Sequence, residues 1–310
     1  ETFNRLDTQD SAAWTALING YIENGYFEEV TDCVEEMQLR GVSPNATIFG
    51  LSFKACGFLR SIKRIQQLYA DAAKQGLENE SFVINMLIGS LVKCGLSFEA
   101  IKIFEHLPVY NVLSWNIMLS AYADHGFDEE LPVLSDRMKL QGILPNAITF
   151  VCILKACGST ATIENGRRIH DEILMTGLLE SDIMVGNALV DMYVKCGSMK
   201  MAQEVFDEIP FRDTILWTTL IAGYAQHGLG LDAFKCFEEM QYEGFSPNAA
   251  TYVCVLKAFS IMELGAEKGR EIHREIAKDG LLGKNALVGN SLIDMYAKHG
   301  HLEEARKVFD

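Results

Sequence analysis

The sequence repeats itself at an interval of about one hundred residues. Trp14, Trp115 and Trp217 begin three similar segments, WTALINGYIENG, WNIMLSAYADHG and WTTLIAGYAQHG, which lie 101 and then 102 residues apart. Two further sets recur at this interval: FGLSFKACG, FVCILKACG and YVCVLKAFS from residues 49, 150 and 252, and NMLIGSLVKCG, NALVDMYVKCG and NSLIDMYAKHG from residues 85, 187 and 290. Self-similarity at a fixed period is typical of proteins built from stacked structural repeats, in which each unit contacts mainly its neighbours.

Each long period divides into three related units. Their shared features align into a first unit of 35 residues, a second of 35 to 37 residues and a third of 31 residues. The predicted units are 11–45, 46–80, 81–111, 112–146, 147–182, 183–213, 214–248 and 249–285, with the end of an earlier short unit at 1–10 and an incomplete short unit at 286–310. Because both ends break into this pattern, we expect the chain to be part of a longer protein.

The apolar residues within a unit have helical spacing. Leu220 and Tyr224 share one helix face, and Ala233, Phe237 and Met240 share another after a break at residues 228–230. Proline cannot continue a helix, so the second helix should end before the Pro-Asn pairs at residues 44–45, 145–146 and 247–248. Each unit is therefore predicted to form two antiparallel helices, and the units to stack into an all-α, right-handed α-solenoid.

Composition limits the classes of protein that fit. With 49% hydrophobic and 22% charged residues among 310, the chain can bury a large core, and it has no apolar run long enough for a membrane helix. A net charge of −15 argues against a protein that coats nucleic acid with basic surface. The eight cysteines recur at equivalent places, which favours reduced, packed thiols over a disulfide framework or a metal site.

These segments resemble the pentatricopeptide repeat family, specifically its plant subclass in which standard-length (P), long (L) and short (S) repeats alternate. The resemblance covers essentially all 310 residues. Tetratricopeptide repeats also form helical hairpins, but they keep a uniform period of about 34 residues, unlike the units of this chain. The resemblance implies a groove lined by first helices, in which single-stranded RNA is bound and one base is read per repeat by the fifth and last residues. It also implies chloroplast or mitochondrial RNA processing, such as cytidine-to-uridine editing, without a cofactor.

The positions that read bases in the family carry short polar side chains in this chain. The fifth residues are Thr15, Asn85, Asn116, Asn187, Thr218 and Asn290, and the last residues are Asn45, Asn111, Asn146, Asp213 and Asn248, with Asp10 closing the leading unit. By resemblance, Thr with Asn favours adenine, Asn with Asp favours uracil, and Asn with Asn favours a pyrimidine, usually cytosine. Read 5′ to 3′ from unit 11–45, the expected register is A, any, C/U, C/U, any, U, A, any, pyrimidine. The long units carry Gly50, Val151 and Val253 at the fifth position, so they are expected to act as spacers or partner surfaces.

The resemblance also implies contacts that are independent of base identity. The second residues of the units, which sandwich bases in the family, are mostly apolar. Ala12 and Ala250 are small exceptions and should bind a base more weakly. The predicted stacking residues are Phe82, Leu113, Ile148, Met184, Ile215 and Leu287. Lys93, Lys195 and Lys298 recur two turns after the reading Asn of the short units, where they either meet phosphates or interact only with the helix dipole.

Other interpretations of the same residues were weighed. His170, His273 and His301 each begin an H-x-E segment of the kind found in zinc deaminases, but the P-C-x-x-C partner occurs nowhere, so we expect packed helix histidines and no enzyme in this chain. The tryptophans are predicted to fill the core between units. Asn and Thr could serve only as helix caps. The main functional alternative is a solenoid that binds proteins, such as editing accessory proteins; no membrane or DNA partner is expected.

Overall fold

The computed structural model describes residues 10–107, 109–124, 126–262 and 265–310, and within them the regular secondary structure is helical without any strand. The all-α prediction is confirmed. Residues 1–9 of the predicted partial unit 1–10 lie outside the described residues. The chain forms two compact units, Glu1–Cys152 and Ile153–Asp310, called here the N-terminal and C-terminal parts and described separately.

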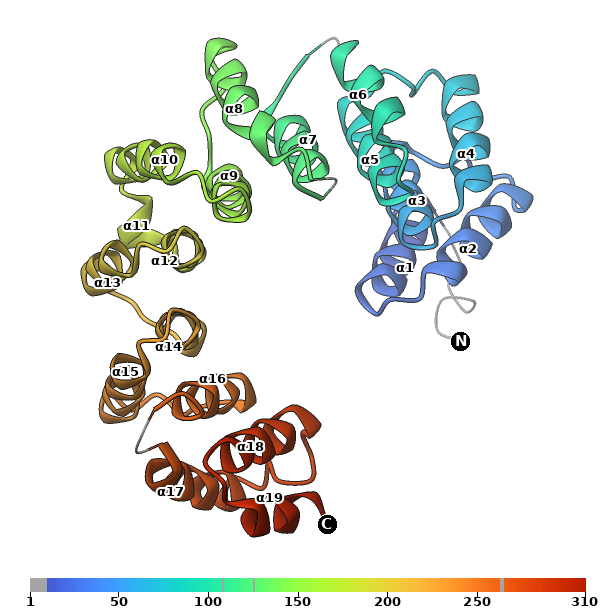
Figure 1. Cartoon of the computed structure of the whole chain (residues 1–310). Helices are drawn as coiled ribbons and strands as arrows, with labels where there is room; N and C mark the ends of the chain where they lie inside the picture. Colours follow the sequence, from blue (N-terminus) through green and yellow to red (C-terminus); the bar gives the residue numbers. More distant parts are fainter. Residues whose placement is uncertain (1–9, 108, 125, 263–264) are drawn as a thin grey trace. The chain divides into compact units, whose positions relative to one another are not determined.

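The N-terminal part consists of antiparallel helix pairs (Figure 1). Its helices are α1 (Ser11–Glu23), α2 (Phe27–Leu39), α3 (Ala46–Phe58), α4 (Ile62–Lys74), α5 (Ser81–Lys93), α6 (Ser97–Glu105), α7 (Val112–Asp124), the 3-10 helix η2 (Asp128–Glu130), α8 (Leu131–Leu140) and the start of α9 (Ala147–Ser159). The first helices α1, α3, α5 and α7 pack on one another in sequence.

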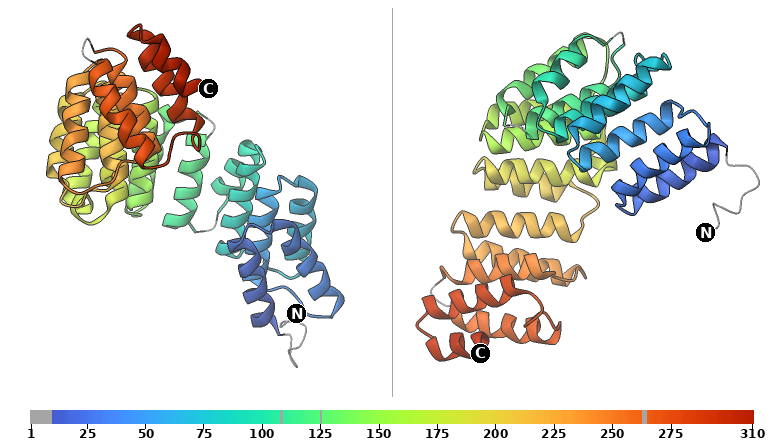
Figure 2. Two further views of the ribbon diagram at one scale, coloured as in Figure 1. Left: turned by 90° about the horizontal axis from the view of Figure 1, so that it is seen from below. Right: turned by 90° about the vertical axis from the view of Figure 1, so that its right-hand side faces the viewer.

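The C-terminal part continues the pattern. Its helices are the end of α9, α10 (Ile163–Thr176), α11 (Leu178–Ser181), α12 (Ile183–Lys195), α13 (Met199–Glu208), α14 (Thr214–Gln226), α15 (Gly230–Tyr242), α16 (Ala249–Phe259), α17 (Gly265–Lys278), α18 (Ala286–Lys298) and α19 (Leu302–Phe309). The first helices α12, α14, α16 and α18 form one layer, and α13, α15 and α17 form the other (Figures 1 and 2). The break predicted at residues 228–230 separates α14 from α15, and Gly228 takes a φ of 76°, which glycine adopts without strain.

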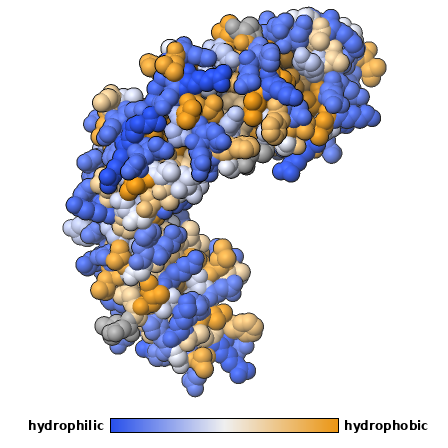
Figure 3. Space-filling model, turned by 45° about the horizontal axis from the view of Figure 1, so that its top comes forward, coloured by the Kyte–Doolittle hydropathy of each residue, from blue (hydrophilic) through white to orange (hydrophobic). Residues whose placement is uncertain are grey.

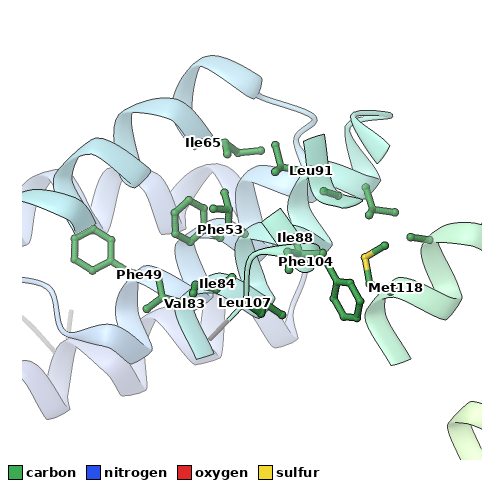
Figure 4. Close-up of a cluster of buried hydrophobic side chains, with 14 of the residues drawn as sticks. Phe49, Phe53, Ile65, Val83, Ile84, Ile88, Leu91, Phe104, Leu107 and Met118 are labelled. Carbon is green, nitrogen blue, oxygen red and sulfur yellow. The ribbon is translucent and has the colours of Figure 1, made fainter. Parts of the chain in front are cut away.

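The core lies between the two helices of each pair and between successive pairs. In the N-terminal part, Phe49 and Phe53 of α3 meet Ile84 and Ile88 of α5, all buried (Figure 4). Apolar side chains at helical spacing on adjacent first helices thus bury one another, which no single pair could do alone.

The three tryptophans are fully or almost fully buried, as predicted for the core between units. Trp115 contacts the ring of Phe104 from the preceding unit at 4.9 Å between centroids, and Trp217 contacts Phe206 at 4.6 Å. These two indoles therefore each join one unit to the second helix of the unit before it.

Candidate nucleic-acid interface

The last residue of almost every predicted unit caps the first helix of the next unit. A side-chain oxygen accepts a hydrogen bond from a backbone N–H in the first turn: Asn45 Oδ1 from Ile48 at 2.9 Å, Asp213 Oδ1 from Leu216 at 2.7 Å and Asn248 Oδ1 from Thr251 at 3.0 Å. Asp10, Asn111, Asn146, Asp182 and Asn285 cap in the same way, whereas Glu80 makes no such bond from its side chain. The cap occupies one oxygen and leaves an amide nitrogen or a second carboxylate oxygen for other contacts.

Two of the predicted reading pairs meet directly. Asn116 Nδ2 donates to Asn146 Oδ1 at 3.1 Å, and Asn187 Nδ2 lies 3.5 and 3.4 Å from the two carboxylate oxygens of Asp213. The fifth residue of a unit and its last residue, some thirty positions apart in sequence, are therefore neighbours in space.

The remaining predicted pairs are arranged differently. Thr15 donates its hydroxyl to the Ser11 carbonyl at 2.7 Å, while Asn45 Nδ2 donates to Ser11 Oγ at 2.8 Å, so these two meet through Ser11. Asn85 is only 2% exposed, and no hydrogen bond joins it to Asn111 among those that the structure describes. At the chain's end, Asn290 is exposed on α18.

The predicted stacking residues form a repeated apolar feature at the surface. Six first helices carry a large apolar side chain at their second residue, with exposed fractions from 39% for Phe82 to 68% for Leu287. The other members are Leu113, Ile148, Met184 and Ile215, and Ala12 and Ala250 are exposed as well. Figure 3 shows hydrophobic residues reaching the surface between hydrophilic ones. Exposed apolar groups at one repeated position are available for stacking against a ligand.

A hollow of about 300 Å³ in the C-terminal part gathers five of the predicted positions. Its walls include Ile215 and Ala250, the second residues of two units, together with the reading pair Thr218 and Asn248. Lys195, one of the three predicted phosphate contacts, lies on the same wall. The hollow therefore combines apolar walls, hydrogen-bonding groups and the Lys195–Asp191 ion pair on the first helices α12, α14 and α16.

The long unit 46–80 has no such space at its fifth position. Gly50 is buried, and a Cβ built on it would lie 2.2 Å from the ring of Phe82. Farther along α3, a Cβ on Gly57 would lie 2.9 Å from the Cα of Ser90 on α5. The two helices are thus in close contact, and the ring of Phe82 fills the place where a reading side chain would stand.

The recurring lysines have partners within the protein. Lys195 pairs with Asp191, and Lys298 with Asp294, each at 2.7 Å one turn earlier on the same helix. The ammonium of Lys93 lies over the ring of Phe58 at 3.4 Å. The carboxylates offset part of the charge of Lys195 and Lys298.

The histidines of two H-x-E segments are packed. His170 Nδ1 lies 2.9 Å from the hydroxyl of Tyr193, and His273 Nδ1 lies 3.0 Å from that of Tyr296. Burial lowers the pKa of both histidines. The described residues contain no group of three or more His, Cys, Asp or Glu side chains that could hold a metal ion.

All eight cysteines are free thiols, as expected. Burial raises the pKa of Cys33 and of Cys56 to about 11, which keeps both protonated and unreactive at neutral pH. Within the described part of the chain, no helix combines the length and apolar character that crossing a membrane requires.

Sequence reasoning did not identify Thr149 and Thr251. Both are fully buried at the third residue of a unit, and both hydrogen bond to a reading side chain of the preceding unit: Thr149 to Asn116 at 2.6 Å and Thr251 to Thr218 at 2.7 Å. One sequence signal could have identified them. Each threonine lies three residues after a capping Asn, which is the spacing of a capping box.

The fold defines a helical-repeat protein in which polar side chains recur at equivalent positions of the units. The chain belongs to the pentatricopeptide repeat family. The PPR repeat family pattern matches residues 9–56 and 212–260, the pentatricopeptide repeat domain matches residues 109–160, and the PPR repeat matches residues 82–112, 187–213 and 290–310. These are non-enzymatic repeats, in agreement with the prediction that the chain is not an enzyme.

Similar proteins occur in Arabidopsis thaliana. A putative mitochondrial pentatricopeptide repeat-containing protein is 33% identical over 97% of this chain, and a chloroplastic one is 32% identical over 99%. This chain covers 48% and 49% of those two relatives, so it spans about half of their length.

A solved structure has the same fold. The crystal structure of the pentatricopeptide repeat protein PPR10 in complex with an 18-nt psaJ RNA element superposes with a TM-score of 0.80 at 16% identity, covering 99% of this chain and 45% of PPR10.

Proposed function

We propose that this chain binds single-stranded RNA sequence-selectively, with one base contacted at each P-type and S-type unit. The observation that carries the proposal is the hollow on α12, α14 and α16, where two second residues, a reading pair and a lysine line one space. Stacking on the apolar walls supplies affinity, and the polar pair supplies selectivity. PPR10, which shares the fold, is bound to RNA in its crystal structure.

The setting of this activity is proposed to be RNA processing in a chloroplast or mitochondrion, with cytidine-to-uridine editing as the specific process. Support comes from the mitochondrial and chloroplastic relatives and from the alternation of 35-residue, longer and 31-residue units that resembles the PLS subclass. The repeats would position the RNA, and the editing reaction would belong to another part of the full protein or to a partner.

A binding titration tests base reading. The probe is a nine-nucleotide RNA with the expected register A, any, C, C, any, U, A, any, C, compared with an RNA in which adenines and pyrimidines are exchanged at the reading positions. We expect the first to bind at least about tenfold more tightly, because several mismatched hydrogen-bonding edges are each worth a measurable fraction of the binding free energy. A control RNA changed only opposite the long units should bind like the first. Equal affinity for the first RNA and the exchanged RNA would reject the proposal.

A second candidate function is protein binding through exposed apolar residues near the ends of the second helices. Met175, Phe211 and Tyr242 each stand at the twenty-ninth residue of their predicted units, and their exposed fractions are 88%, 70% and 93%. Large apolar side chains this exposed at one repeated position are typical of interaction surfaces. Replacing all three by serine should abolish binding of a purified editing accessory protein and leave the RNA titration unchanged. Unchanged binding of that protein would remove this candidate.

A further inference from the structure

We propose that the buried threonine at the third residue of the following unit decides which hydrogen-bonding groups a reading side chain presents to RNA. This inference rests on the proposed RNA-binding function and concerns Thr149 and Thr251. Because both are fully buried, they act through the reader and are positioning residues.

The orientation of Asn116 follows from a chain of hydrogen bonds that begins at the backbone. The N–H of Thr149 can only donate, so the Asn146 atom that lies 3.1 Å from it must be the amide oxygen. Asn116 also approaches this oxygen at 3.1 Å, and it must do so with its nitrogen. The oxygen of Asn116 is then left at 2.6 Å from the Thr149 hydroxyl, which donates to it.

The hydroxyl of Thr149 has one proton to donate. The oxygen of Asn116, at 2.6 Å, is closer than that of Asn146, at 3.0 Å, and the hydroxyl in turn accepts the N–H of Asn146 at 3.1 Å. Both amide oxygens of the pair therefore accept hydrogen bonds within the protein, and Asn146 Oδ1 accepts two of them. The amide N–H groups that these bonds do not use are the donors that the pair offers to a base. Cytosine offers two acceptors, N3 and O2, on its Watson–Crick edge, whereas uracil has an N–H at position 3. The pair should prefer cytosine.

Thr251 gives the reader Thr218 the opposite character. Thr218 lies 2.7 Å from the carbonyl of Thr214, which cannot donate, so the proton of Thr218 is used there. The 2.7 Å contact between the two hydroxyls must then carry the proton of Thr251. Thr218 is left with one lone pair and no proton to donate. It therefore suits adenine, which presents an amino group at position 6, over guanine, which presents an oxygen there.

The pair Asn187 and Asp213 shows what happens without such a threonine. The third residue of the following unit is Leu216, which has no hydroxyl, and Asp213 can only accept, so Asn187 turns its nitrogen toward the carboxylate. Asn187 Oδ1 is buried and has no hydrogen-bond partner among the residues that the structure describes. The carboxylate accepts hydrogen bonds only, which matches the N–H of uracil. Asn187 Oδ1 has no hydroxyl beside it in the described part of the chain, whereas Asn116 Oδ1 accepts from Thr149. The last residues of the two units, Asp213 and Asn146, differ as well.

The experiment compares wild type with Thr149→Val, which has nearly the same shape but no hydroxyl, and with Thr149→Ser, which keeps the hydroxyl. Affinity is measured for two RNAs that differ only by C or U at the fourth nucleotide, and for a second pair that differs by A or G at the seventh. We expect wild type and Thr149→Ser to favour cytosine. Thr149→Val should lower the C-to-U affinity ratio about three- to tenfold, as expected for one lost hydrogen bond, and leave the seventh position unchanged.

Thr251→Val provides the matched variant, with the effect confined to the seventh nucleotide. It also keeps the inference testable in case Thr149→Val does not fold. If a folded variant keeps the wild-type base preference and loses only thermal stability, its threonine is a helix-cap residue alone and the inference is wrong. If wild type shows no base preference at any position, the proposed function itself fails, which is a distinguishable result.

Discussion

The asparagines that end the units stabilise the fold before any RNA is bound. Asn248 closes a capping box with Thr251 at the start of α16 and also lines the hollow proposed to hold a base. Asn248→Ala should lower the free energy of unfolding by about 1 kcal/mol, and Asn248→Ser, which can still cap, by much less. Chemical denaturation measures both. Both variants should alter base preference at the seventh nucleotide, so a Ser variant with wild-type preference would show that Asn248 only caps.

The buried histidines predict how stability depends on pH. Burial lowers the pKa of His170 below its ordinary value of 6.5, so between these two values the unfolded chain binds a proton that the folded chain does not. Stability should therefore fall as the pH decreases through about 6.5. His170→Phe, which places at this position the residue found at Phe104 and Phe206, should flatten a plot of Tm against pH between about pH 7.5 and 5.5. Burial also lowers the pKa of His273, so adding His273→Phe should flatten it further. An unchanged slope in the double variant would contradict this interpretation.

At the scale of helices, close packing of α3 on α5 depends on glycine. A Cβ at Gly57 would meet the backbone of α5, whereas a Cβ at Gly20 of α1 would meet nothing within 4 Å. We expect Gly57→Ala to destabilise the protein by about 1–3 kcal/mol and Gly20→Ala to stabilise it by about 0.5–1 kcal/mol through helix propensity. Gly50→Ala should cost less than Gly57→Ala, because the half-exposed ring of Phe82 can swing away. Denaturation curves of the three variants decide the order, and equal effects at Gly20 and Gly57 would exclude tight packing as the cause.

The sequence predicted most of these helices because each depends on local signals. Apolar spacing, the glycine at position 228 and the Pro-Asn pairs place helices and breaks correctly, and the tryptophans are buried as expected. The short helices η2 and α11 were not predicted, since they lie in connections without a regular apolar pattern. Nor was the role of Thr149, because its bond to Asn116 joins residues 33 positions apart and depends on how closely α9 approaches α7. The positions of the reading pairs followed from family resemblance, whereas their hydrogen-bond directions required coordinates.

For the whole molecule, charge sets how RNA can be held. The chain has 27 basic and 42 acidic residues, and carboxylates one turn away already accompany Lys195 and Lys298. If only the three recurring lysines neutralise phosphates, log K should fall with log salt with a slope of about −2. A titration series from low to high salt measures this slope. A much steeper dependence would show that binding rests on general attraction to phosphates and not on stacking and base contacts.

If the polar pairs read bases, as we claim, exchanging one member of a pair should reverse a base preference. Affinities of wild type and Asn187→Thr are measured for two RNAs that differ only by U or G at the sixth nucleotide. Wild type should favour uracil, because the Asp213 carboxylate accepts hydrogen bonds only. The variant should favour guanine, a purine that also presents N–H groups to this carboxylate, so that the order of the two affinities reverses. If Asn187→Thr weakens both RNAs by the same factor, Asn187 has a structural role only and the claim is contradicted.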